Sequence, residues 1–327
     1  MRTRLLTARG LAGLGLLAGS CLSFHAALAQ SRASFVHERD IMTQFGQVIP
    51  EWGGSALVGI DFNWTKTPML YAVDREGRRD EVWLDLPRAE TVYAHFATGG
   101  PDGAIAVVGQ AESSDSRRGA FLIWVSPDRK RRTVIQIEPY FAQRVTLAGD
   151  GTIWTVGGLR DAARTDVAKM NIIKRYDTTG KELASFHVSA RARPAIAPDA
   201  ASMSYLMASR DRVGWFTNGG EYIEFSLDGK EIARFDGPPD LDFEQISGVG
   251  LDAENGLFVG RKGDETFDFE VLELDRSSRA WKKAAVAGPN KPHWARILGF
   301  DGTTLITMEG SDKVHRYTRA KGEGVAQ

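Results

Sequence analysis

Cysteine is almost absent from this chain. Of 327 residues only Cys21 is a cysteine, and it lies within the first thirty. A disulfide framework, a cysteine-based zinc or iron–sulfur site and a thiol nucleophile are therefore excluded for the rest of the chain. A protein with no thiol to oxidise suits an oxidising compartment.

An excess of charge of either sign is also lacking, as is a second long apolar run. Lys and Arg number 41 against 42 Asp and Glu. This balance offers no electrostatic footprint for nucleic acid or for an anionic membrane. Because a membrane-spanning helix needs about 20 apolar residues, no transmembrane anchor is expected.

The N-terminal residues have the features of a secretory signal peptide. Basic residues precede an uncharged apolar run over 11–22, and Ala27–Ala29 has the small-x-small pattern of a cleavage site. We expect 1–29 to be removed, leaving 30–327 as one periplasmic or secreted domain. The residues before Cys21 resemble a lipobox, so a lipoprotein anchored there is the alternative.

A unit of strand, turn and strand recurs six times. In each copy an apolar or aromatic residue is followed by Asp, Ser or Thr, then by turn residues and a base. These second residues are Asp74, Ser126, Asp177, Ser226, Asp275 and Thr318. Successive copies lie 52, 51, 49, 49 and 43 residues apart. A period near 50 residues, with strands in every unit, predicts a β-propeller.

Each unit is expected to form one four-stranded antiparallel blade. In the third unit, hairpin-type alternation and turn residues predict strands at Val145–Ala148, Thr152–Val156, Asn171–Tyr176 and Glu182–Phe186. The predicted fold is therefore all-β, a six-bladed β-propeller.

The last unit has no fourth strand, because the residues after Thr318 are polar and rich in glycine. A ring must not leave open sheet edges, since these invite aggregation. We therefore expect the N-terminal segment Ser34–Val48 to supply the missing outer strand and close the ring.

Two stretches resemble known propeller repeats. Asp150–Gly157 is similar to the D-G-x-I-W-x-x-G signature of bacterial sensor-type propellers, and Arg175–Glu182 resembles the strand-turn-strand core of NHL-type six-bladed propellers. The resemblance implies the same architecture for the mature chain. This group includes binding scaffolds, lactonases and other hydrolases, so the resemblance implies no single activity.

The long predicted loops lie on one face of the ring, which we call the long-loop face. They are Gln110–Arg118, Gly158–Lys169, Val188–Ser202, Asp236–Gln245 and Ala287–Arg296. Binding residues concentrate on loops held by a rigid scaffold, so we expect a ligand site on this face, at the mouth of the channel. Solvated insertions without a binding role are the alternative.

The candidate ligand-binding residues on this face are Arg144, Arg164, His293, Trp294 and Arg296. Arginine binds carboxylate and phosphate groups bidentately, and Trp and Arg are enriched at binding hot spots. A histidine can serve as a base or a metal ligand. The alternative for the arginines is surface charge paired with nearby acids.

Asp240, Asp242 and Glu244 occupy alternate positions of one loop. If this loop is extended, the three side chains point the same way and could hold Ca²⁺, which takes oxygen ligands. A solvated acidic loop is the other interpretation. No other cofactor is expected.

Signatures of catalysis are missing. The sequence has no G-x-S-x-G elbow, Walker loop or Rossmann fingerprint, and its six histidines form no pair at zinc-motif spacing. It therefore favours a monomeric binding scaffold for a protein, peptide or glycan over an enzyme. A hydrolase or lactonase with a divalent cation at the channel mouth is the alternative.

Overall fold

Strands make up nearly all of the regular structure. The computed structural model describes residues 30–42, 51–61, 68–115, 117–160, 170–193, 200–201, 203–262, 269–287, 295–310 and 313–320. The predicted signal peptide lies outside them. Within the described ranges, no helix is long and apolar enough to cross a membrane.

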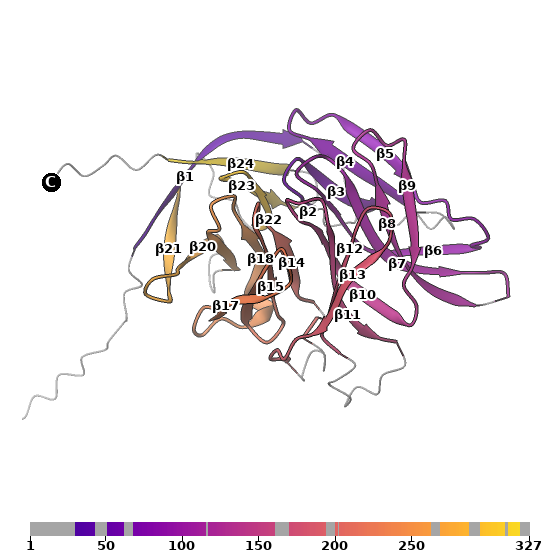
Figure 1. The fold of residues 1–327 in the computed structure, drawn as a ribbon. Helices are drawn as coiled ribbons and strands as arrows, with labels where there is room; N and C mark the ends of the chain where they lie inside the picture. The colour runs from indigo at the N-terminus through magenta and orange to yellow at the C-terminus, as the bar shows by residue number, and fades with distance from the viewer. Residues whose placement is uncertain are drawn as a thin grey trace, which may run out of the picture.

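Four antiparallel four-stranded sheets follow one another along the chain (Figure 1). The first contains β2 (Glu51–Trp52), β3 (Ala56–Asp61), β4 (Met69–Asp74) and β5 (Arg79–Trp83). The second contains β6 (Thr91–Gly99), β7 (Ile105–Glu112), β8 (Arg118–Val125) and β9 (Arg132–Gln136). The third contains β10 (Tyr140–Leu147), β11 (Ile153–Leu159), β12 (Ile172–Tyr176) and β13 (Glu182–His187). The fourth contains β14 (Tyr205–Ala208), β15 (Arg212–Phe216), β16 (Glu221–Ser226) and β17 (Glu231–Asp236).

The remaining strands form one eight-stranded sheet. Its order is β18-β19-β20-β21-β1-β24-β23-β22. The strands are β1 (Gln30–Met42), β18 (Ile246–Leu251), β19 (Leu257–Lys262), β20 (Phe269–Asp275), β21 (Ala280–Ala287), β22 (Ala295–Asp301), β23 (Thr304–Glu309) and β24 (Lys313–Arg319). The sequence predicted six separate four-stranded sheets, and this part of the prediction is corrected by the eight-stranded sheet.

The difference arises from β1, which forms hydrogen bonds along both of its edges. It pairs antiparallel with β24 and in parallel with β21. Figure 1 shows it as a long indigo strand beside the yellow β24, with its first residues near β21. The sequence placed the N-terminal segment next to the last strand but did not predict the parallel pairing.

The chain forms consecutive antiparallel strand sets, namely the four four-stranded sheets, β18–β21 and β22–β24, and the first strands of successive sets are neighbours around an axis. β6 lies against β10, β10 against β14, β14 against β18, and β18 against β22. β2 contacts both β22 and β6, which completes the circuit. The sheets therefore have a propeller-like arrangement, with the first strand of each set innermost.

Apolar side chains fill the spaces between neighbouring sheets. Trp154 of the third sheet and Trp215 of the fourth are both fully buried in one cluster. Inner strands such as β18 and β22 are buried along most of their length, whereas outer strands such as β9 and β13 alternate between exposed and half-buried residues. This is the expected pattern for sheets that pack face to face around a ring.

The recurring Asp or Ser of the sequence repeat caps the turn between the third and fourth strands. Asp177 Oδ1 accepts hydrogen bonds from the backbone N–H of Thr179 at 2.9 Å and of Lys181 at 3.0 Å. Together with the Thr179 hydroxyl, these bonds lower the pKa of Asp177. In the second sheet the Ser126 hydroxyl lies in this place and donates to Asp128. The repeat thus reflects turn chemistry.

Candidate functional site

A cavity of about 350 Å³ lies on the axis of the ring, within the size range of small-ligand pockets. The first strand of every set contributes to its wall. One such residue from each strand, in order, is Trp52, Thr98, Thr146, Met207, Val249 and Leu298. The wall is mixed in polarity, with threonine hydroxyls among aromatic and aliphatic side chains.

The cavity lies toward the end of the channel that is framed by the short turns between first and second strands, which we call the short-turn face. These turns supply Gly53, Pro101, Gly149, Arg210 and Gly302 to the lining. The site predicted from the sequence lies at the opposite mouth, on the long-loop face.

Backbone contacts between neighbouring sheets hold the short turns in place. A Cβ built on Gly53 would lie 1.8 Å from the carbonyl oxygen of Gly99, and one on Gly149 would lie 2.3 Å from that of Arg210. No side chain fits at such distances, so glycine permits this close approach. The rim of the cavity is therefore a rigid backbone frame.

Most charged groups around the cavity are already compensated. Arg75 forms an ion pair with Asp301, which also accepts a hydrogen bond from Arg316 Nη2 at 2.9 Å. Asp252 is fully buried, and burial raises its pKa. Its carboxylate accepts hydrogen bonds from the N–H of Gly256 at 2.6 Å and from Arg319 at 3.1 Å. These groups hold turns and blades together.

Arg210 differs from Arg75, the other cationic residue of the lining. It is exposed, and no ion pair or side-chain hydrogen bond joins it to any other residue that the structure describes. An exposed guanidinium at the rim can donate hydrogen bonds to a ligand that displaces its water. Arginine is the side chain best suited to a carboxylate or phosphate group, so the rim of the cavity favours an anion.

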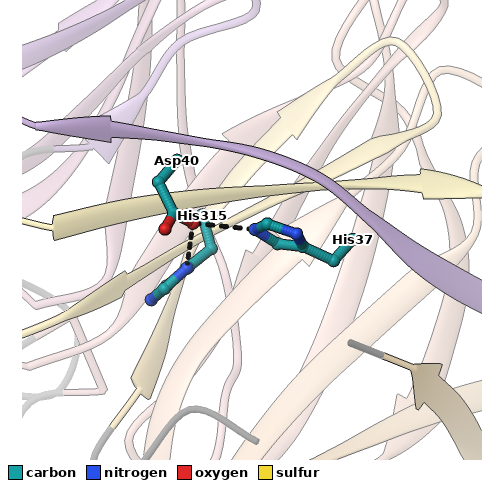
Figure 2. A group of neighbouring side chains, drawn as sticks. All are labelled: His37, Asp40 and His315. Atoms are coloured by element: carbon teal, nitrogen blue, oxygen red, sulfur yellow. Dashed lines mark hydrogen bonds and ion pairs between the residues drawn. The ribbon is translucent and has the colours of Figure 1, made fainter. Parts of the chain in front are cut away.

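A second group of polar side chains lies away from the cavity, on β1 and β24. Asp40 Oδ1 is 2.7 Å from His37 Nε2 and 2.7 Å from His315 Nδ1 (Figure 2). Partial burial of Asp40 raises its pKa, but hydrogen bonds from both histidines and from Lys313 outweigh this and lower the pKa to about 2. The carboxylate is therefore ionised throughout the physiological range.

Of the ligand-binding residues predicted from sequence, the structure describes Arg144 and Arg296, and neither lines the cavity. Arg144 Nε donates to the carbonyl of Ser204 at 2.6 Å, and its guanidinium lies over the ring of Phe96 at 5.0 Å. Arg296 is half-buried on β22, opposite Met308. The other three candidates, Arg164, His293 and Trp294, lie outside the described residues.

The three acidic residues proposed for Ca²⁺ are exposed, and they do not lie on one extended strand. The chain has a positive φ of 59° at Asp240, and a 3₁₀ helix follows over Phe243–Gln245. Asp242 forms an ion pair with Arg193 at 3.0 Å. The alternation that would direct the three side chains to one side therefore does not apply to this loop.

The sequence alone did not predict a role for Arg210 or for the group around Asp40. Arg210 lies in a short turn that has no distinctive sequence motif. Its position near the axis follows from the packing of the sheets into a ring. No short sequence motif contains both His37 and His315. The predicted pairing of the N-terminal segment with the last strand was the one signal in the sequence that these two histidines could be close together.

Comparison with known proteins yields a likeness of fold only. No protein-family model matches the chain, and no curated protein matches it. Among solved structures, the crystal structure of BBS1N in complex with ARL6DN, soaked with lead, is similar over 89% of this chain and 99% of that chain. The identity is 10% and the TM-score 0.42, values that carry no information about what this chain binds.

Proposed function

We propose that the eight-stranded sheet consists of two blades joined by β1, so that the ring has six blades. Strands β18–β21 and β22–β24 are each consecutive antiparallel sets. β1 stands beside β24, where the fourth strand of the last set belongs. Six innermost strands surround the cavity, which supports this blade count.

We further propose that the protein is a binding scaffold, and that it receives an anionic group of its partner in the axial cavity. The observation that carries this proposal is the placement of the uncompensated Arg210 at the rim of a cavity built by every blade. The partner is a protein, peptide or glycan that presents a carboxylate or phosphate on a narrow, partly apolar group. The long-loop face, with Arg296, Arg164, His293 and Trp294, is a second surface for such a partner.

Replacing Arg210 by Ala tests the cavity. Inorganic phosphate and a panel of simple carboxylates serve as probes, and binding is measured by thermal shift and calorimetry. We expect the parent protein to bind a member of the panel, and Arg210→Ala to weaken that binding about 10- to 100-fold, the usual loss for a charge-assisted hydrogen bond. The melting temperature without ligand stays unchanged, because the side chain is exposed.

Arg117→Ala is the matched control, since Arg117 is an exposed arginine on the long-loop face. It should leave binding unchanged. Binding that survives in Arg210→Ala, or a parent protein that binds nothing in the panel, would contradict the proposed site. Equal losses in both variants would point to nonspecific attraction to positive charge.

We propose that the protein is exported and cleaved after Ala29. This cleavage position is compatible with the fold, because it leaves the strand β1 (Gln30–Met42) intact. Intact-mass analysis of the protein from the periplasm or the medium should give a chain that begins at Gln30. A lipid-modified chain that begins at Cys21 would instead establish the lipoprotein alternative.

A further inference from the structure

Three side chains on the junction between β1 and β24 bring metal-ligand atoms together. One atom each from His37, Asp40 and His315 lies within 4.8 Å of the other two. Figure 2 shows both imidazoles directed at the same carboxylate, one from the indigo strand and one from the yellow. Two imidazoles and a carboxylate are a typical ligand set for Zn²⁺.

A β-bulge in β1 creates this group. Residues three apart on a regular strand, such as His37 and Asp40, point to opposite faces of the sheet. The pairing of β1 with β24 skips Glu38, between His37 and Arg39, so the strand contains one extra residue there. The extra residue reverses the alternation and places His37 and Asp40 on the same side. Bulges often re-aim side chains in this way next to functional sites.

A second carboxylate, that of Glu309, contacts the other ring nitrogen of His315 and fixes the orientation of the ring. Its Nε2 is 3.1 Å from Glu309 Oε2, while its Nδ1 faces Asp40. When Nε2 carries the proton and donates to Glu309, Nδ1 presents a lone pair to the Asp40 oxygen. In the metal-free protein a proton on Nδ1 closes this 2.7 Å contact, and a bound cation would replace that proton. A carboxylate–histidine pair of this kind is the usual outer support of a metal-binding histidine.

The surroundings of the group are partly open to solvent. Lys313 Nζ is 3.3 Å from Asp40 Oδ2, so the oxygen that faces the histidines is the other one. The side chains of His37 and Asp40 are 20% and 34% exposed, which gives solvent access. The ring of Tyr317 lies 5.5 Å from that of His37 and forms one wall.

We propose that His37 Nε2, Asp40 Oδ1 and His315 Nδ1 bind Zn²⁺, with water completing the coordination, and that the ion fastens β1 to β24. Asp40 and His315 are 275 residues apart in the chain, so the unfolded protein has no such site. The binding free energy therefore stabilises the folded state. This inference is independent of the anion proposed for the cavity, because none of the three residues lines it.

Thermal unfolding of chelator-treated, untagged protein tests the site. We expect Zn²⁺ at about 100 times its Kd to raise the melting temperature by on the order of 5 °C for a domain of this size. Ca²⁺ and Mg²⁺ should have no such effect, because they prefer all-oxygen sites. Calorimetry should give a stoichiometry of about one ion per chain.

Variants assign the effect to the named side chains. His37→Ala and Asp40→Asn, at partly exposed positions, should each weaken zinc affinity more than about tenfold, and Glu309→Gln about tenfold. His95→Ala is the control, since His95 is exposed and its ring nitrogen contacts only Gln110 among the described residues. It should keep the full zinc effect. A parent protein without a zinc shift, or a shift that persists in His37→Ala and Asp40→Asn, would overturn the proposal.

Discussion

Phe35→Ala should destabilise the protein by about 3–5 kcal/mol, the usual cost of removing a buried phenylalanine. Phe35 is fully buried and belongs to β1. Its ring packs edge-on against Phe258 at 5.4 Å and lies 6.2 Å from Phe300. It therefore anchors the N-terminal strand to both halves of the eight-stranded sheet. Chemical denaturation gives the free energy of unfolding.

The neighbouring residue supplies the control. Val36 is 45% exposed, so Val36→Thr should change stability by no more than about 0.5 kcal/mol. Weaker anchoring of β1 uncovers the edges of both β21 and β24, so Phe35→Ala should also aggregate sooner on heating. Similar stability of the two variants would mean that β1 contributes little to the ring, and that the parallel pairing with β21 is dispensable.

The second large effect is expected at Glu224, a buried carboxylate that joins two sheets. Arg276, from the turn after β20, donates to its two oxygens at 2.5 and 2.7 Å. Arg212 Nη1 is 3.2 Å away, and the Tyr222 hydroxyl donates at 3.0 Å. Glu224→Ala leaves both cations without this partner, so we expect a loss of about 3–5 kcal/mol in the free energy of unfolding.

Glu231 offers a matched comparison. It forms a bidentate pair with Arg234 at 2.9 and 2.8 Å, but its side chain is 42% exposed. Glu231→Ala should therefore cost no more than about 1 kcal/mol, because solvent screens exposed ion pairs. Restoring stability by the double change Glu224→Met with Arg276→Met would identify unpaired charge as the cause. Equal losses at Glu224 and Glu231 would refute the assigned importance of burial.

Local chemistry determined much of the secondary structure. The third unit was predicted to have a strand at Thr152–Val156 and another at Glu182–Phe186, and the structure has β11 at Ile153–Leu159 and β13 at Glu182–His187. The Asp150-Gly151 turn was expected, and Gly151 has a φ of 79°. Such features are readable because alternation and turn residues act over a few positions.

The candidate site was much less predictable. The sequence pointed to long loops and to arginines beside inner strands, yet Arg144 is held by Ser204 and Phe96. Arg210 became a candidate only once the axial cavity was visible. Whether an arginine is available to bind a ligand depends on which neighbouring groups already pair with its charge. Those neighbours come from other blades.

The sequence alone therefore determined the all-β class, the period of about 50 residues and the positions of most strands. Only the tertiary structure decided that β1 pairs with β21 as well as β24 and that the cavity lies toward the short-turn face. It also brought Asp40 to His315 across 275 residues. The reason is physical: a strand's own pattern specifies which residues are buried, whereas its partner at each edge is chosen by packing across the whole ring.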